Sequence, residues 1–180
     1  MTQVPLIPPA MTRRRAARGN PDVEPLWEIL EQVTDPEIPV LSLSDLGILQ
    51  NVERQGDGVV VTITTTYSGC PAMDVIGDDI RQVLHQAGYA NVTVKQRLFP
   101  AWTTDWISAA GRRKLREYGI APPAEASRSK SALLGAQPIV PCPLCASTRT
   151  EKVSEFGSTA CKALYRCQDC REPFDYFKCI

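Results

Sequence analysis

Two pairs of cysteines near the C-terminus have the spacing of a metal site. Cys142 and Cys145 form one C-x-x-C pair, Cys167 and Cys170 form the second, and 21 residues separate the pairs. Two intervening residues let both thiolates of a pair reach one ion at about 2.3 Å, and four thiolates complete a closed tetrahedral site. The pattern predicts one structural Zn²⁺ per chain. Iron fits the same spacing, and two disulfides are the alternative in an oxidising compartment.

A fifth cysteine lies where a predicted strand gives way to a predicted helix. Cys70 follows Gly69 and precedes Pro71. A thiolate there would face unpaired backbone N–H groups and the positive end of the helix, which lower the pKa of a thiol and favour metal binding or nucleophilicity. From these residues alone, a structural and a reactive role fit equally well.

The remaining candidates for chemistry are weaker. Cys161 is followed by Lys162, whose charge would lower the pKa of the thiol, but a buried structural cysteine is the simpler interpretation; Cys179 receives no role. The one histidine, His85, has Gln82 three residues before it, so the chain lacks the Glu-x-x-His pairs of di-iron oxygenases. It also lacks a Gly-rich dinucleotide fingerprint. We therefore expect no oxidation chemistry on this chain alone.

The elements that would position these residues follow from periodicity and capping signals. They alternate in the order α-β-β-α-β-α, which predicts an α+β fold with a small sheet covered by helices. The expected segments are a helix from Pro21 to Asp35, strands at 46–52 and 59–63 joined by a turn, a helix at 71–87, a strand at 91–99 and a helix from Ser108 to Gly119. Gly88 is expected to end the helix at 71–87 in the left-handed conformation, and Ser108 to cap the last helix.

Four regions follow along the chain. Residues 1–20 read as a flexible basic arm, residues 21–120 as the α+β domain, residues 121–137 as a linker and residues 138–180 as a zinc ribbon. A unit the size of the ribbon buries too little surface to fold alone, so its metal would supply the missing stability. Within it we expect a hairpin of residues 152–156 and 163–166, with aromatic side chains, Phe156 among them, packed on the cysteine pairs.

Charge and composition limit the partners. The formal net charge is zero, which argues against a nucleic-acid or membrane-surface binder. Residues 1–20 carry four arginines and no acid, whereas residues 21–100 carry 12 acidic and 4 basic side chains. Protein partners or a solvated surface explain this asymmetry. No apolar run has the roughly 20 residues of a membrane helix, and the N-terminus does not read as a secretory signal. We expect a cytoplasmic protein with reduced cysteines.

Three motifs carry a resemblance to a known family. The runs at 35–40 (DPEIPV), 44–48 (SDLGI) and 69–71 (GCP) resemble, in this order and spacing, the iron–sulfur assembly factor family that includes SufT. The resemblance covers about residues 22–100. It implies a surface that handles iron or a nascent iron–sulfur cluster transiently. Cys70 matches the reactive cysteine of that family, and Asp35, Glu37 and Asp45 match its acidic positions. Together with its place before Pro71, the resemblance predicts that Cys70 is a partly exposed thiol of lowered pKa near the acidic side chains of residues 35–45.

The rest of the chain narrows the resemblance. Together with those motifs, residues 100–107 (PAWTTDWI), 118–123 (YGIAPP), 156–167 (FGSTACKALYRC) and 172–178 (EPFDYFK) resemble the PaaD family (also called PaaJ). These are the small accessory subunits of the bacterial phenylacetyl-CoA oxygenase, or epoxidase, system. The resemblance implies a role in aerobic phenylacetate degradation and in the maturation of a di-iron or iron–sulfur partner component. A purely structural or docking subunit is the alternative, and hydrolase chemistry at Cys70 lacks an evident base.

Overall fold

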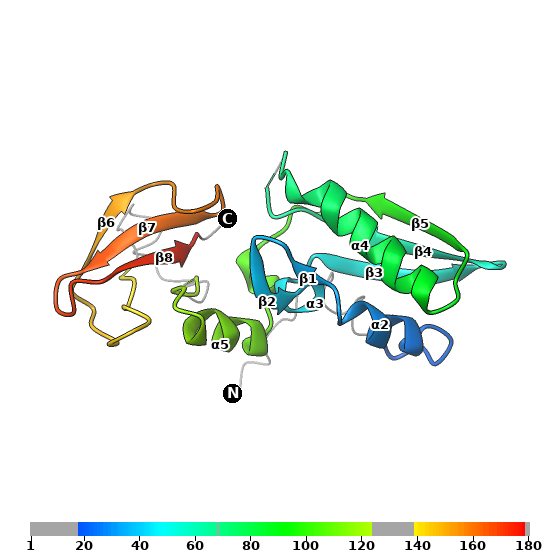
Figure 1. The fold of residues 1–180 in the computed structure, drawn as a ribbon, viewed down its shortest axis with the longest axis horizontal. Helices are drawn as coiled ribbons and strands as arrows, with labels where there is room; N and C mark the ends of the chain where they lie inside the picture. The colour runs from blue at the N-terminus through cyan, green and yellow to red at the C-terminus, as the bar shows by residue number, and fades with distance from the viewer. Residues whose placement is uncertain (1–17, 68, 124–138, 179–180) are drawn as a thin grey trace, which may run out of the picture.

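The computed structural model describes residues 18–67, 69–123 and 139–178 (Figure 1). Most of the predicted arm and linker therefore lie outside the described residues. Figure 1 shows two units, an N-terminal one with a three-stranded sheet and a C-terminal one with a second three-stranded sheet. Helices and small sheets in this arrangement confirm the predicted α+β class. None of the described helices is long and apolar enough to cross a bilayer.

The first sheet has the order β3-β4-β5. Strand β3 (Leu49–Gln55) pairs antiparallel with β4 (Gly58–Ile63), and Gly56 turns the chain between them with φ 62°. Strand β5 (Asn91–Gln96) runs parallel to β4 because α4 (Ala72–Gln86) crosses between them. The predicted turn, second strand and second helix are confirmed to within a few residues.

Helix α4 covers this sheet with one apolar face (Figure 1). Ile76, Ile80 and Leu84 recur at helical spacing and are fully buried in the core. The opposite face is polar and carries the exposed His85. Gly88 follows the helix with φ 93°, a conformation that favours glycine.

The first helix begins later than predicted. Helix α2 (Glu24–Leu30) starts after Val23, not at Pro21. The carbonyl of Asn20 accepts bonds from the backbone N–H groups of Val23 and Glu24 at 3.0 Å, so residues 20–23 form a separate turn. Its apolar residues at helical spacing, Leu26, Trp27 and Leu30, are buried.

A small hairpin and a one-turn helix lie between α2 and the first sheet. They are β1 (Thr34–Asp35), β2 (Ile38–Ser42) and α3 (Leu43–Leu46). The sequence analysis predicted none of them and placed a strand at 46–52. That start is wrong because residues 43–46 are helical and Gly47 ends the helix with φ 74°.

Helix α5 (Ala109–Glu117) follows a short 3₁₀ turn, η1 (Thr104–Trp106). The side chain of Ser108 caps α5 by accepting from the N–H of Gly111 at 2.8 Å, as predicted. The helix contacts β2 and α3, and Figure 1 places it below the junction of the two units. It therefore helps to fix the β1–β2 hairpin.

The C-terminal unit is an antiparallel sheet of order β6-β7-β8. Strands β6 (Thr150–Ser154) and β7 (Lys162–Cys167) form the predicted hairpin with shifted bounds, and β8 (Pro173–Phe177) is an additional strand. Phe156 does not pack on the cysteine pairs as predicted. Its side chain is 64% exposed, and the ammonium of Lys178 lies 4.7 Å from its ring centroid.

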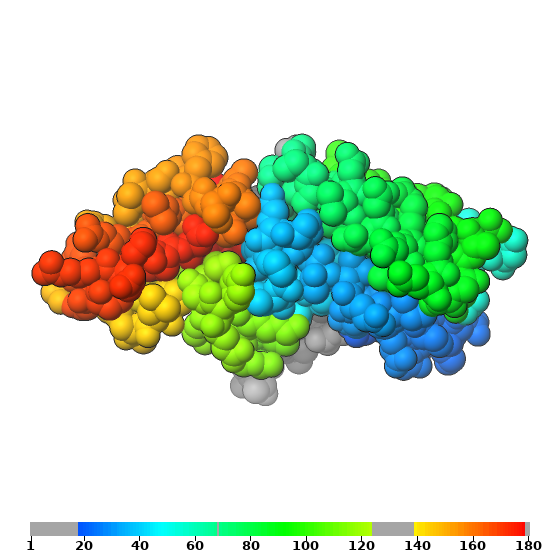
Figure 2. All heavy atoms as spheres, in the orientation of Figure 1, coloured from blue at the N-terminus to red at the C-terminus, as the bar shows by residue number. Residues whose placement is uncertain are grey.

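The two units share a packed junction. Phe177, at the end of β8, and Cys161, just before β7, are buried in the core of the N-terminal unit. The rings of Phe177 and Trp102 lie 6.0 Å apart between centroids. Ala121 joins β8 through two backbone bonds, donating to Asp175 and accepting from Phe177, so the residue expected to begin the linker extends the ribbon sheet. Figure 2 shows the two units in direct contact.

Candidate metal centres

The four paired cysteines of the ribbon converge on one point. Their sulfur atoms all lie within 4.8 Å of one another, and among the described residues this is the one such group of three or more metal-ligand side chains. The sulfur atoms of Cys142 and Cys170 are 3.8 Å apart, and those of Cys145 and Cys167 are 3.5 Å apart. A tetrahedron with ~2.3 Å bonds has edges of about 3.8 Å. The donor set and its dimensions therefore fit Zn²⁺.

The two cysteine pairs lie in equivalent turns. Ala146 follows Cys145 with φ 61°, and Arg171 follows Cys170 with φ 67°. Left-handed backbone is uncommon at residues other than glycine, so its occurrence at the same position of both turns marks a shared local structure. Asp169 links the turns through a salt bridge with Arg149. The ribbon is thus built around its four sulfur atoms.

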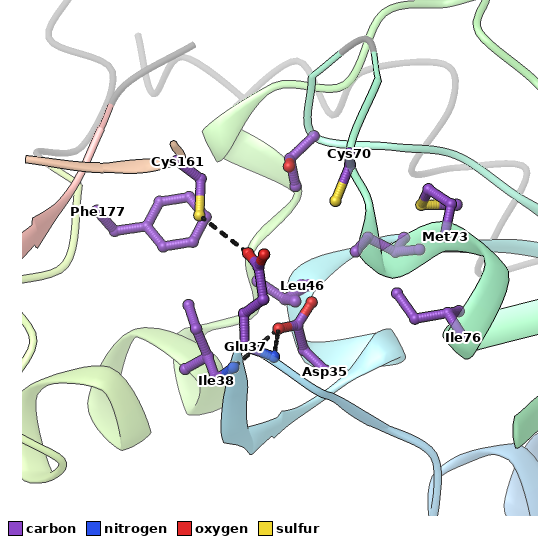
Figure 3. A pocket seen from close by; sticks show the side chains of 11 residues that line it. Asp35, Glu37, Ile38, Leu46, Cys70, Met73, Ile76, Cys161 and Phe177 are labelled. Atoms are coloured by element: carbon purple, nitrogen blue, oxygen red, sulfur yellow. Dashed lines mark hydrogen bonds between the residues drawn. The ribbon is translucent and has the colours of Figure 1, made fainter. Parts of the chain in front are cut away.

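A second group of metal-ligand side chains lies where the two units meet. Asp35, Glu37, Cys70 and Cys161 line one cavity, whose other walls are mostly apolar. Figure 3 shows both thiols and both carboxylates facing the same central space. Asp35 ends β1 and Glu37 lies in the β1–β2 turn, Cys70 precedes α4, and Cys161 precedes β7 of the ribbon. Three separate parts of the chain therefore supply the donors.

Asp35 shapes the hairpin and faces the cavity. Its Oδ1 atom accepts the N–H groups of Glu37 and Ile38, both at 2.8 Å, which holds Glu37 at the turn. The residue is only 8% exposed. Burial raises the pKa of the Asp35 carboxyl, and the two backbone bonds and the charge of Lys162 offset this only in part.

Cys70 is half-buried, but the prediction of a lowered pKa is wrong. Burial raises the pKa of the Cys70 thiol, and the negative charges of Glu37 and Asp35 raise it further. The N–H of Ala72, at the start of α4, and the hydroxyl of Tyr67 act in the opposite direction and are outweighed. Burial and the neighbouring thiol in turn raise the pKa of Tyr67 to about 12. A thiol in these surroundings is a poor free nucleophile, whereas a cation between the groups would favour the thiolate.

Cys161 is the member of this group that sequence analysis did not place here. Its sulfur atom lies 3.9 Å from Oε2 of Glu37, 124 positions away in the sequence, and 3.1 Å from Oγ1 of Thr159. The residue is 5% exposed. Burial is the main cause that raises the pKa of its thiol, although the hydrogen bond to Thr159 and the charge of Lys162 lower it. Only the tertiary fold brings this cysteine to Glu37.

Asp45 does not line the cavity. Its carboxylate accepts the hydroxyl of Ser108 at 2.7 Å and pairs with the ammonium of Lys114 at 2.5 Å. It also completes a capping box at α3 with Ser42. Burial raises the pKa of the Asp45 carboxyl, but the bonds from Lys114 and Ser108 outweigh it, and the net pKa is lowered. In the structure Asp45 therefore caps α3 and joins it to α5, away from the cavity that the other predicted residues line.

Comparison with known proteins identifies the family. Residues 24–95 match the iron-sulfur cluster assembly protein family, and residues 126–178 match the PaaD zinc beta ribbon domain. A protein from Escherichia coli (strain K12), provisionally named as the D subunit of 1,2-phenylacetyl-CoA epoxidase, is 52% identical over 168 residues, which cover 93% of this chain and 99% of that protein. The chain belongs to the PaaD family. Both resemblances drawn from the motifs are thereby confirmed.

The first unit also has relatives outside the PaaD family. An Fe-S protein maturation auxiliary factor from Porphyromonas gingivalis (strain ATCC BAA-308 / W83) is 39% identical over 87 residues, which cover 47% of this chain and 82% of that protein. A solved structure of a domain of unknown function, DUF59, from Bacillus anthracis matches with a TM-score of 0.48 and 26% identity, over 59% of this chain and 96% of that one.

The cavity of this PaaD-family protein draws on both matched segments. Asp35, Glu37 and Cys70 belong to the segment that matches the assembly family, and Cys161 belongs to the segment that matches the ribbon. Sequence analysis found the first three through short motifs. It missed Cys161 because no local signal tells a cysteine that faces another domain from one in its own core.

Proposed function

We propose that this chain is an accessory subunit of a phenylacetyl-CoA epoxidase system and that it helps to load iron or an iron–sulfur cluster into a partner component. The Escherichia coli relative supports the system, and the maturation factor supports the activity. The observation that carries the proposal is that Cys70 faces the carboxylates of Asp35 and Glu37 in one cavity.

These donors suit a metal cargo better than covalent catalysis. A catalytic thiol needs a base or a positive neighbour to become a thiolate. Cys70 instead faces two acidic side chains, which raise the pKa of its thiol. A divalent ion between the thiol and the carboxylates reverses that penalty, because its charge stabilises all of them in their ionised forms. Thiolate and carboxylate ligands together accommodate iron.

The ribbon has a separate role in this proposal. Cys142, Cys145, Cys167 and Cys170 hold one Zn²⁺ and leave no position open for a substrate. This ion stabilises the ribbon and performs no chemistry. The partners are the other components of the epoxidase system, namely its di-iron and iron–sulfur proteins.

Replacement of Cys70 by serine tests the proposal. The partner components are produced with wild-type chain, with Cys70→Ser or with Asp74→Asn, which alters a carboxylate in the first turn of α4 outside the cavity. We expect Cys70→Ser to fold normally and to lower partner iron content and epoxidase turnover at least severalfold, whereas Asp74→Asn leaves both unchanged. Fully metallated, fully active partners with Cys70→Ser would show that the chain is a structural or docking subunit.

A further inference from the structure

One cysteine of the ribbon, Cys161, lines the cavity at the junction with the first unit. Cys70 and Cys161 are 91 positions apart and belong to different units, yet both line the cavity with Glu37 and Asp35 (Figure 3). The zinc site does not use Cys161, because four other thiols already complete its tetrahedron. Cys161 is therefore left available for a ligand at the junction.

Cys161 is held in place by the strands of the ribbon. Its carbonyl accepts the N–H of Lys178 at 3.0 Å, and the carbonyl of the next residue, Lys162, accepts the N–H of Gly157 at 2.8 Å. A Cβ atom at Gly157 would lie 2.4 Å from Oδ1 of Asp175, so any other residue there would displace the Asp175 side chain. The backbone that carries the thiol is thus fixed by hydrogen bonds to two other segments of the ribbon.

The size of the cavity limits what it can hold. Its volume is about 10 Å³, roughly the smallest volume that holds one water molecule. A single metal ion fits such a space, whereas an iron–sulfur cluster, with its several iron and sulfide atoms, does not fit unless the units move apart. Apolar side chains such as Ile76 and Phe177 complete the walls and shield an ion from water.

The donor atoms are spread more widely than those of the ribbon. No three of them lie within 4.8 Å of one another, as the four ribbon sulfurs do. The side chains must move inward to bind an ion, and Glu37, which lies in a hairpin turn, has the longest and most adaptable of them. A site that is not fully preformed binds more weakly and releases its ion more easily than a preorganised one. This suits transient cargo.

We propose that Cys161 is the second thiolate ligand of a junction site that binds one Fe²⁺ ion as cargo, with Cys70, Glu37 and Asp35 as the other ligands. This inference rests on the proposed function and deepens it, since it names a single ion as the cargo and gives the ribbon a direct part in holding it. Each thiol releases its proton to water as the ion binds. No oxidant or reductant takes part.

Cobalt titration tests the site directly. The full-length chain, with zinc already in the ribbon, is titrated anaerobically with Co²⁺, whose thiolate complexes show sulfur-to-metal charge-transfer absorption. We expect one Co²⁺ per chain beyond the zinc, with a charge-transfer intensity that corresponds to two thiolates. Cys70→Ser and Cys161→Ser should each halve this intensity and weaken Co²⁺ binding at least 10-fold. Glu37→Gln should weaken binding and retain the intensity.

Two controls keep the outcome interpretable. Glu53→Gln alters an exposed carboxylate on β3 and should bind Co²⁺ as the wild type does. Cys161→Ala provides a second variant in case a hydroxyl is not tolerated at a buried position, and zinc content shows that the ribbon stays folded. Unchanged Co²⁺ binding by Cys161→Ser and Cys161→Ala, or no Co²⁺ beyond the zinc in the wild type, overturns the inference.

The inference and the proposed function fail in different ways. If Cys70→Ser impairs partner loading while both Cys161 variants bind Co²⁺ normally, the inference is wrong and the proposed function stands. If both cysteines bind Co²⁺ as expected but partner loading is intact without Cys70, the junction site is supported as a metal site and its role in loading is wrong.

Discussion

The structure separates acidic residues that stabilise the fold from those that line the cavity, and Asp45 gives the sharpest test of that separation. The motif resemblance assigns Asp45 to iron handling, whereas in the structure its carboxylate accepts hydrogen bonds from Ser108 and Lys114 and caps α3. The informative change is Asp45→Asn, which keeps the size and one acceptor oxygen but removes the charge. It should destabilise the fold and leave metal binding at the junction unchanged.

The magnitude follows from three contacts. The bond from Ser108, at 2.7 Å to a charged acceptor, is worth about 1.5–3 kcal/mol, and a neutral amide retains roughly half of that. The pair with Lys114 contributes at most about 1 kcal/mol, because the lysine side chain is 43% exposed to solvent. The N–H of Ser42, at 3.5 Å, adds little. The free energy of unfolding should therefore fall by about 1–2 kcal/mol, or by roughly 2–8 °C in Tm.

The effect should depend on pH in a defined direction. The pKa of Asp45 is lowered in the folded state, below an unfolded value of about 3.9. The stabilisation is therefore fully present above pH ~4 and is lost as the pH falls through the folded pKa. Asparagine cannot titrate, so the difference in unfolding free energy between wild type and Asp45→Asn should shrink below pH ~4.

Urea unfolding at pH 7, 5, 4 and 3 measures both the magnitude and the pH dependence. The matched control is Asp78→Asn, which breaks a similarly short ion pair, to Arg81 at 2.7 Å, on the exposed face of α4. This control should change stability by less than about 0.5 kcal/mol. If Asp45→Asn is as stable as the wild type yet fails to bind Co²⁺ or to support partner loading, Asp45 is a ligand and the structural reasoning is wrong.

Two further predictions concern the ribbon and the junction. The purified chain should contain about one zinc, with four sulfur ligands by X-ray absorption. Cys142→Ser should unfold the ribbon while the first unit stays folded, because the metal supplies the folding energy of the ribbon. Nitrogen ligands, or an ordered ribbon without metal, would contradict this prediction. Phe177→Ala removes a ring that is 1% exposed and packs on Trp102, which should cost about 3–5 kcal/mol and speed alkylation of Cys161 severalfold. An unchanged alkylation rate would show that Phe177 does not shield the junction.

Local signals in the sequence were sufficient for the larger elements. The capping side chain of Ser108 and the positive φ of Gly88 appear in the structure where the sequence predicted them, because caps and left-handed glycines act over a few residues. The metal site of the two cysteine pairs could also be predicted from the sequence, since each turn brings its own two sulfur atoms together. Helix α3 was not predicted because four residues give no periodicity. It also depends on contacts of Asp45 with Ser108 and Lys114, which lie more than 60 positions away in the sequence.

The junction site shows more clearly that local sequence patterns do not predict contacts between distant segments of the chain. Short motifs named Asp35, Glu37 and Cys70, and the structure places all three around one cavity. The motif assigned Asp45 to the same iron-handling site, although its contacts in the structure make it a capping residue of α3. The interpretation of Cys161 as a buried cysteine does not reveal this site, because the residues next to it in the sequence include no acid and no other thiol. Contacts across more than 100 positions depend on how the units dock, which no local pattern encodes.

The zinc site and the junction site are linked through the strand that separates them. Strand β7 (Lys162–Cys167) begins directly after Cys161 and ends on Cys167, a ligand of the four-sulfur site. The ribbon core is small, with Tyr165, Phe174 and Tyr176 as its main aromatic contacts, so the strand keeps its place only while the metal holds the cysteine pairs together. Loss of zinc would therefore withdraw Cys161 from the cavity even though Cys70, Asp35 and Glu37 remain on an intact first unit. If the junction binds an ion as proposed, the structural metal of the ribbon therefore also controls whether all four ligands of the junction site are in place.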